Sequence, residues 1–215
     1  MTSTYRQTTA SEYFTNDRAD VVAKLPRPLG RVLDVGCGAG GVGRSLRAAG
    51  AERLAGVEVH APAAEEARTV FDTVYTGTIE DAVATDALEG PFDTIVLYDV
   101  LEHLVDPGAV LARLDQLAGP RAQVHVSVPN ARHWSLLYDL VARGTFGYTE
   151  WGHRDRTHLR WFTRRDIAAL LEAHGWHVSD VSSSVPGRNA TVDRVTGGRL
   201  REFLALQWHV LARRG

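Results

Sequence analysis

Short apolar runs alternate with amphipathic stretches along most of the chain. The runs that we predict to be strands are residues 31–35, 54–59, 72–76, 92–98 and 123–128. The stretches between them that we predict to be helices are residues 44–49, 61–71 and 106–117. Strands that alternate with helices in this way are typical of crossover units, so the pattern predicts a mostly parallel sheet.

The regular pattern returns near the C-terminus. Thr163 and Asp166 have the spacing of a helix capping box, which predicts a helix over 163–174 that Gly175 ends. Two further strands are expected at 176–181 and 203–212, and the polar segment 182–198 between them is expected to be a mobile loop. With a helix over 11–25 at the N-terminus, the prediction is a single α/β domain over 1–215, whose segment 1–30 is helical.

Aromatic side chains concentrate in residues 130–162. This segment contains Trp134, Tyr138, Phe146, Tyr148, Trp151, Trp161 and Phe162. Large rings with polar edges suit a pocket that must be both apolar and hydrogen-bonding, so we interpret the segment as an insert that caps a binding cleft. A small hydrophobic core that belongs to the insert itself is the alternative, and the two interpretations are compatible.

Composition narrows the classes of function. The 24 basic and 26 acidic side chains give a formal charge of -2, so no bulk electrostatic attraction to nucleic acid or to an anionic membrane is expected. No apolar run approaches the roughly 18 residues that span a membrane, and the N-terminus lacks the order of a signal peptide. Together with a single cysteine, Cys37, these features predict a cytoplasmic protein.

Lysine is nearly absent, and this excludes two chemistries. Lys24 is the only lysine, and it lies between Ala23 and Leu25. It follows no glycine-rich loop, so a phosphate-binding loop of the ATPase kind is excluded, and its setting does not suit a pyridoxal Schiff base.

A glycine-rich loop follows the first predicted strand and precedes a helix. Its sequence is Gly-Cys-Gly-Ala-Gly-Gly over residues 36–41. Glycines allow sharp turns and close approach of the backbone to a ligand at the helix N-terminus, so the context predicts a nucleotide site. The spacing of Gly36, Gly38 and Gly41 also fits a dinucleotide fingerprint. Glu58, at the end of the second strand, would accept hydrogen bonds from ribose hydroxyls with either type of ligand.

Asp34 separates the two types of ligand. It lies two residues before the first glycine of the loop, where its carboxylate would repel a pyrophosphate and attract an ammonium group. S-adenosyl-L-methionine carries an ammonium group and a ribose but no phosphate, so it fits these residues better than a dinucleotide.

Residues 32–40, the acidic Glu58 and Asp93 resemble class I S-adenosylmethionine-dependent methyltransferases, and the resemblance extends over nearly the whole chain. It implies a doubly wound, Rossmann-like sheet of seven strands, here with the aromatic insert after the fifth. Residues 98–104 and 127–130 resemble the quinone-type and bacterial polysaccharide-associated branch of this class, and residues 152–163 are similar to a segment that recurs in it. These last motifs identify relatives and not a substrate.

The resemblance also implies roles in cofactor binding. Asp34, Gly36 and Gly38 would hold the methionyl part, Glu58 the ribose and the Ile79 backbone the adenine, while Tyr98 would contribute its main chain. Tyr13 would cover the cofactor, with a core aromatic as the alternative. Thr78 stands where the class often has an acid that reaches the adenine, and Glu80 follows two residues later. The expected cofactor-binding set is Tyr13, Asp34, Gly36, Cys37, Gly38, Gly40, Glu58, Val59, Thr78, Ile79 and Tyr98.

Histidines are the candidates for acid–base chemistry. Methyl transfer is an in-line displacement, and a base assists it when the acceptor is a hydroxyl. The candidates are His103, His133, His153 and His158. We rank His158 first, because Asp155 could fix its tautomer and raise its basicity, and we retain His133 as a further catalytic candidate. A structural hydrogen-bond cluster of Asp155, His158 and Arg160 is the alternative.

Asp99, Glu102 and His103 follow the fourth predicted strand and would share one face if this segment is helical, an arrangement that could hold a hard metal ion. We favour the interpretation that they line the cofactor pocket and cap a turn, so no metal site is predicted.

The predicted function is methyl transfer from S-adenosyl-L-methionine to a hydroxyl oxygen of a small-molecule acceptor. N-methylation of an amino sugar or amino acid, and a cofactor-binding regulatory protein without turnover, remain as alternatives. No nucleic-acid or membrane partner is expected. The oligomeric state stays open, with a homodimer as one option.

Overall fold

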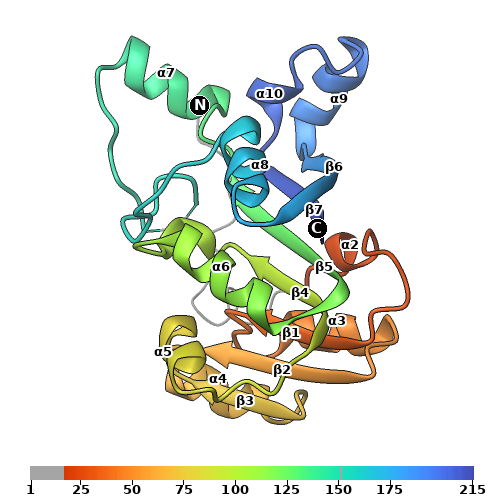
Figure 1. The fold of residues 1–215 in the computed structure, drawn as a ribbon. Helices are drawn as coiled ribbons and strands as arrows, with labels where there is room; N and C mark the ends of the chain where they lie inside the picture. The colour runs from red at the N-terminus through yellow and green to blue at the C-terminus, as the bar shows by residue number, and fades with distance from the viewer. Residues whose placement is uncertain (1–16, 151) are drawn as a thin grey trace. The chain divides into compact units, whose positions relative to one another are not determined.

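The computed structural model describes residues 17–150 and 152–215. The chain divides into two compact units, the first ending at Thr94 and the second beginning at Ile95 (Figure 1). The expected Tyr13 contact and the first part of the expected helix over 11–25 lie outside the described residues. No helix in the part that the structure describes is long and apolar enough to cross a membrane.

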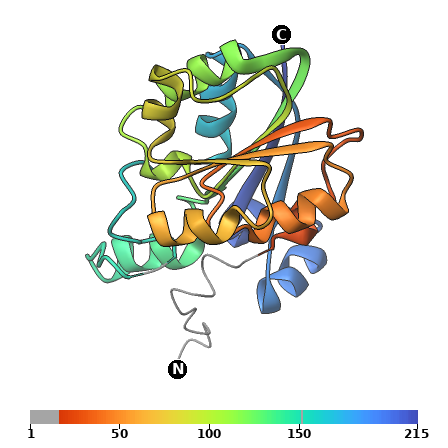
Figure 2. The same cartoon turned by 90° about the horizontal axis from the view of Figure 1, so that it is seen from below.

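The first unit is built from parallel strands with helical crossovers. Its elements are α2 (Ala19–Val22), β1 (Arg31–Val35), α3 (Gly41–Ala48), β2 (Arg53–Glu58), α4 (Ala61–Ala67), β3 (Thr73–Thr76) and α5 (Ile79–Ala84). Strand β2 pairs in parallel with β1 and with β3. Helices α3 and α4 lie along the same side of β1 and β2 (Figure 2). Because β1 and β2 are parallel, their carboxyl ends lie at the same edge of the sheet.

The second unit carries the C-terminal half of the chain. Strand β4 (Phe92–Tyr98) leads into it, followed by η1 (Leu101–His103), α6 (Pro107–Leu117), β5 (Ala118–Pro129), α7 (Trp134–Ala142), α8 (Arg164–Glu172), β6 (Trp176–Ser184), α9 (Gly187–Val195), α10 (Arg201–Leu204) and β7 (Gln207–Arg214). Strand β7 pairs antiparallel with both β5 and β6.

The strands form one seven-stranded sheet with the order β3-β2-β1-β4-β5-β7-β6. The predicted Rossmann-like, mostly parallel α/β sheet is thereby confirmed. The apolar runs that predicted β1 and β4 are buried as expected, with Val32, Leu33 and Ile95 among the fully enclosed side chains.

The prediction of a mobile loop over 182–198 is wrong. Strand β6 extends to Ser184, and α9 occupies most of the remaining segment. Helix α9 has almost no apolar face, so its pattern gave no helical signal. Its buried residue is Asp193, whose carboxylate accepts two hydrogen bonds from Arg201, at 2.8 and 3.1 Å. The buried contact of this helix is thus an ion pair to Arg201, eight residues further along the chain, and not a hydrophobic stripe.

The segment 130–162 is closed at its base. Asn130 and Phe162 form an isolated bridge, and the Ala131 N–H donates to the Phe162 carbonyl at 2.9 Å. The segment includes α7, a helix that the sequence analysis did not predict.

Candidate functional site

The glycine loop turns sharply at the carboxyl end of β1. Gly36, Gly38 and Gly40 have φ values of 75°, 54° and 85°, which L side chains rarely adopt. The N–H groups of Gly36 and Cys37 both donate to the Val57 carbonyl, at 2.8 and 3.1 Å. The loop is thus anchored to β2 and enters α3 at its N-terminus, as the sequence predicted.

Cys37 packs against a glycine of β2. A Cβ added at Gly56 would lie 2.7 Å from Cys37 Sγ, so the thiol occupies the space that a side chain at Gly56 would fill. Burial raises the pKa of the Cys37 thiol, with Asp34 and Glu58 adding to the effect. The side chain is therefore a packing group, and any contact that this residue makes with a cofactor would come from its main chain.

Glu58 is held by the backbone on both of its oxygens. Its Oε2 accepts from the Gly38 N–H at 2.9 Å, and its Oε1 accepts from the His60 N–H at 2.8 Å. A carboxylate oxygen can accept more than one hydrogen bond, so both atoms can still accept from ribose hydroxyls. The carboxylate is oriented in advance, and it also fixes the glycine loop.

Asp34 is a buried carboxyl group that is only partly satisfied. Only 2% of the residue is exposed, and Oδ2 has no hydrogen-bond partner among the described residues. Burial raises the pKa of Asp34 well above its ordinary value, and the neighbouring Glu58 raises it further. A buried carboxyl group of this kind ionises most readily beside a cation, so the ammonium group of S-adenosyl-L-methionine fits this position and a pyrophosphate does not.

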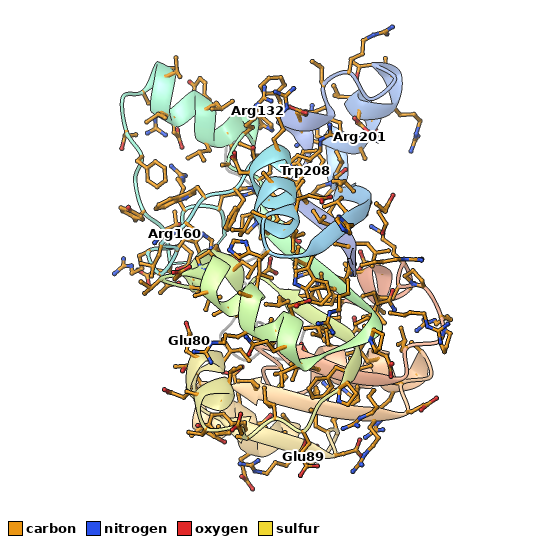
Figure 3. All side chains as sticks on the ribbon, viewed as in Figure 1. Glu80, Glu89, Arg132, Arg160, Arg201 and Trp208 are labelled. Carbon is orange, nitrogen blue, oxygen red and sulfur yellow. The ribbon has the colours of Figure 1, made fainter. Side chains whose placement is uncertain are left out.

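The residues expected near the adenine lie in two segments of the first unit. Val59 follows Glu58 and is 66% exposed, so it offers an apolar surface beside the carboxylate. The Thr78 hydroxyl accepts from the Asp81 N–H at 3.0 Å as the N-cap of α5, and Ile79 is buried directly after it. Capping uses an acceptor site of Thr78 but leaves its hydroxyl proton free to donate. Glu80 projects from the first turn of α5 and is exposed (Figure 3).

Tyr98 belongs to the second unit, where its hydroxyl lies 2.9 Å from His125 Nδ1. This contact fixes the side chain and is consistent with a role for the main chain alone.

His158 is buried in the second unit with one bare ring nitrogen. The residue is 7% exposed, and Nδ1 has no hydrogen-bond partner in the part of the chain that the structure describes. The side chain bonds to the backbone of His153, which leaves Nε2 as the nitrogen that donates. The neutral ring is thus set in the tautomer in which Nδ1 is the acceptor.

The environment of His158 keeps it neutral. Burial lowers its pKa most, and the nearby His103 lowers it further, while Asp155, the His153 backbone and Asp99 act in the opposite direction. A neutral imidazole at pH 7 whose Nδ1 lone pair accepts no hydrogen bond from the described residues has the protonation state that a general base requires.

Asp155 does not fix the tautomer of His158, so the expected role of this carboxylate is corrected. Its Oδ1 accepts from the Thr157 N–H at 2.8 Å and from the Thr157 hydroxyl at 2.7 Å. The Thr157 hydroxyl lies 3.1 Å from Nδ1 of His103, and the rings of His103 and His158 are 4.8 Å apart. The Asp155 carboxylate therefore acts on the His158 ring through its charge, which raises the pKa of His158 as expected, while its hydrogen bonds lead to His103 through Thr157. The reason is local, because the turn at 155–157 directs the carboxylate back to its own backbone.

The expectation that Asp99, Glu102 and His103 share a helix face is also wrong. Asp99 has a φ of 58° and lies before η1, which contains only Leu101–His103. Its Oδ1 instead accepts from Gln207 Nε2 at 2.7 Å and from the Ser127 hydroxyl at 3.2 Å.

His158 joins Glu102 and His103 instead of Asp99. One side-chain nitrogen or oxygen from each of these three residues lies within 4.8 Å of the others. The Glu102 carbonyl accepts from the N–H groups of Leu159 and Arg160, at 2.8 and 3.0 Å, which attaches the insert to the residue next to His103. Sequence reasoning gave no signal for this pairing, because the residues are far apart in the chain.

His133 and His153 form a second histidine pair, with stacked rings 4.9 Å apart. His133 Nδ1 lies 2.8 Å from the Ser135 hydroxyl, and burial lowers the pKa of His133. Burial lowers the pKa of His153 to about 4, and the neighbouring His133 contributes to the shift. Nδ1 of His133 has a partner, whereas Nε2 of His153 is buried without one among the described residues. We rank His158 above both because it also lies beside His103 and Glu102.

The aromatic rings of the insert are largely exposed. Phe146 contacts Tyr148 and Trp161 in edge-to-face geometry, at 5.2 and 5.4 Å between centroids. Trp134, Tyr148 and Trp161 remain partly accessible, and Trp151 lies outside the described residues. Their role as walls of an acceptor pocket stays a prediction.

Residues 6–181 match the family model described as "Methyltransferase domain". The chain belongs to this methyltransferase family. The predicted class I fold and the cofactor S-adenosyl-L-methionine are thereby confirmed, and the dinucleotide alternative is rejected. The family assignment agrees with the geometry of Asp34, Glu58 and the glycine loop.

Curated relatives and solved structures of this methyltransferase family extend the comparison. The chain is 32% identical over 135 residues to "Ubiquinone biosynthesis O-methyltransferase" of Aromatoleum aromaticum, a match that covers 56% of each chain. It is 28% identical over 187 residues to the protein of that name from Xylella fastidiosa, covering 77% of this chain and 68% of the relative. The chain thus spans little more than half the length of the first relative.

A solved "SAM dependent methyltransferase from Archaeoglobus fulgidus" superposes with a TM-score of 0.65 at 18% identity, covering 95% of this chain and 97% of the other. At that identity the likeness concerns the fold.

Proposed function

We propose that this methyltransferase transfers the methyl group of S-adenosyl-L-methionine to a hydroxyl oxygen of a small-molecule acceptor, with His158 as the general base. The observation that carries the proposal is the bare, buried Nδ1 of His158, whose ring tautomer is set by the His153 backbone. The name shared by the curated relatives, which specifies O-methylation, supports oxygen as the methylated atom.

The cofactor, when bound, supplies a methyl group on a positively charged sulfur, which is an electrophile that needs no metal or covalent intermediate. Asp34 would bind its ammonium group and Glu58 its ribose hydroxyls. These contacts orient the donor, and orientation is the main demand of an in-line displacement. The glycine loop contributes backbone N–H groups and space for close approach.

His158 would remove the proton of the acceptor hydroxyl. Nδ1 accepts this proton as the oxygen attacks the methyl carbon, and the imidazole becomes an imidazolium. Asp155 and Asp99 lie close enough to favour that charged form. A hydroxyl of high pKa needs such a base at neutral pH, whereas a neutral amine does not.

N-methylation is the alternative within enzymes, and a cofactor-binding protein without turnover is the alternative outside them. A panel of catechols, simple phenols, amino sugars and amino acids, incubated with the full chain and labelled S-adenosyl-L-methionine, separates these options by the mass of the methylated product. We expect an O-methylated phenol or alcohol. Methylation confined to amines, or none with any acceptor class, would contradict the proposal.

Replacing His158 tests the base. His158→Ala should lower turnover by about 10²–10⁴-fold with a hydroxyl acceptor, with little change in cofactor affinity or thermal midpoint. His177→Gln is the matched control, because His177 is an exposed histidine on β6 outside the cluster. If His158→Ala melts early and its residual activity follows the folded fraction, His158 is structural.

A further inference from the structure

A buried base needs a way to discharge its proton. In the proposed reaction the O–CH3 bond forms as the S–CH3 bond breaks, and the electron pair of the broken bond stays on sulfur. The hydroxyl proton moves to Nδ1 of His158, so each turnover leaves one proton on a side chain that is only 7% exposed. The next turnover requires that this proton reach the solvent.

His103 is the titratable side chain in ring contact with His158, and it is less deeply buried. The two ring centroids are 4.8 Å apart and the planes meet at 72°. One ring nitrogen of His103, one ring nitrogen of His158 and one carboxylate oxygen of Glu102 lie within 4.8 Å of one another. A small rotation of either ring, or one bridging water, spans such a separation.

The ring of His103 is held from the opposite side. Its Nδ1 lies 3.1 Å from the Thr157 hydroxyl and 3.3 Å from the Thr157 carbonyl. The Thr157 hydroxyl donates its only proton to Asp155 Oδ1 at 2.7 Å. It must therefore accept from His103, which places the proton of the neutral His103 ring on Nδ1 and leaves Nε2 as an acceptor.

We propose that His103 acts through His158 as a positioning residue and proton relay, with Thr157 and Asp155 holding it in the tautomer that can receive a proton on Nε2. The proton passes from the buried His158 to the more accessible His103 and then to the solvent. This inference rests on the proposed function of His158 as the base. It gives Asp155 a role, because its carboxylate orients the relay through Thr157.

The charges around the pair suit a transient cation. The Glu102 carboxylate lies within the cluster, and Asp99 and Asp155 act on His158 from two other segments. Among the groups that face His158, His103 opposes its protonation. A proton on one ring therefore disfavours a proton on the other, which is the coupling expected of two sites that pass one proton between them.

The tautomers can be read without any acceptor. In ¹⁵N-labelled full-length protein, long-range ¹H–¹⁵N spectra should show the proton of neutral His103 on Nδ1 and that of His158 on Nε2. Thr157→Val should abolish the preference at His103, while Thr157→Ser should keep it. His103→Gln should raise the titration midpoint of His158, whereas His177→Gln should leave it unchanged.

Two spectroscopic results would overturn the relay. One is a proton on Nε2 of His103 in the unmodified protein, and the other is a His158 midpoint that ignores His103→Gln. The same spectra are also recorded during a titration with Mg²⁺. If the ion displaces the protons from the rings of His103 and His158, the cluster is a cation site and not a relay.

The second test of the relay is kinetic. It uses a hydroxyl acceptor that the panel of phenols, sugars and amino acids has shown to be methylated. Glutamine at position 103 can still donate to Thr157 but cannot carry a proton at neutral pH. His103→Gln should keep the rate of the first turnover within about threefold of the unmodified protein but slow later turnovers by about tenfold or more. Added imidazole buffer should restore the steady-state rate.

The two arms distinguish the proposals. Unchanged turnover in His158→Ala contradicts the base and therefore the proposed function. Loss of activity in His158→Ala together with unimpaired multiple turnover in His103→Gln contradicts the relay alone.

Discussion

Glu58 Oε2 accepts a hydrogen bond from the backbone N–H of Gly38 at 2.9 Å, so the carboxylate at the end of β2 directly fixes the glycine loop that follows β1. The second oxygen is fixed by the His60 N–H at 2.8 Å. One side chain thus joins the two segments that we expect the cofactor to contact, and a change at Glu58 should affect both the ligand and the loop.

Glu58→Gln should weaken binding of S-adenosyl-L-methionine by about 1.5–3 kcal/mol, because the amide offers one acceptor oxygen where the carboxylate offers two. It should also lower the thermal midpoint, since either Gly38 or His60 loses its partner. Calorimetry and thermal denaturation measure the two effects. Glu66→Gln, an exposed carboxylate on α4, is the control, and equal affinities of the two variants would place the ribose elsewhere.

Asp34→Asn should separate binding from stability. The folded-state pKa of Asp34 is raised, so stability without ligand falls as the pH rises from the ordinary pKa of a carboxyl group toward the folded-state pKa, and the loss persists above it. At pH 7 the neutral amide should therefore increase the free energy of unfolding by about 1–3 kcal/mol. Cofactor affinity should fall, because the ammonium group loses its counter-charge. Thermal shifts with and without S-adenosylhomocysteine test this, and a variant that binds like the unmodified protein would refute it.

The affinity of the unmodified protein should also decrease as the pH falls through the raised pKa of Asp34, because the protonated carboxyl no longer attracts the ammonium group. In Asp34→Asn this pH dependence should be absent.

Gly56→Ala should displace the glycine loop from β2. The new methyl group would lie 2.7 Å from Cys37 Sγ, so the loop must shift, at a cost of about 1–3 kcal/mol in stability and with weaker cofactor binding. Cys37→Ala in the same chain removes the sulfur and should restore part of both losses. Effects that simply add in the double variant would show that the two residues do not compete for this space.

His153 should make the protein sensitive to mild acid. Its folded-state pKa is about 4, against an ordinary value of 6.5, so the stability it contributes is present above pH 6.5 and is lost as the pH falls toward 4. The loss is roughly 3–3.5 kcal/mol at most, from the size of the shift. His153→Gln should flatten the decline of the thermal midpoint between pH 7 and 4.5. An unchanged slope would show that His153 titrates normally.

Local signals in the sequence determined much of the fold. The bounds of β4 and α6 agree with prediction. An apolar run between polar residues specifies β4, and the Asp106 cap before Pro107 specifies the start of α6. Both signals depend only on residues close together in the sequence. The Thr163–Asp166 capping box also forms as predicted. The glycine loop, Asp34 and Glu58 were identifiable for the same reason, since each occupies a fixed place relative to the end of a strand.

Only the tertiary structure determined which residues far apart in the sequence are in contact. His103 contacts His158, Cys37 packs on Gly56 and Gln207 bonds to Asp99, and no local pattern connects the residues of these pairs. Asp155 accepts a hydrogen bond from Thr157, and Asp99 accepts hydrogen bonds from Ser127 and Gln207. A short polar side chain bonds to the nearest available group, and the sequence does not show which group that is. Periodicity and capping specify elements, whereas the partners of a buried polar group depend on which backbone and side chains the packed elements bring within about 3 Å.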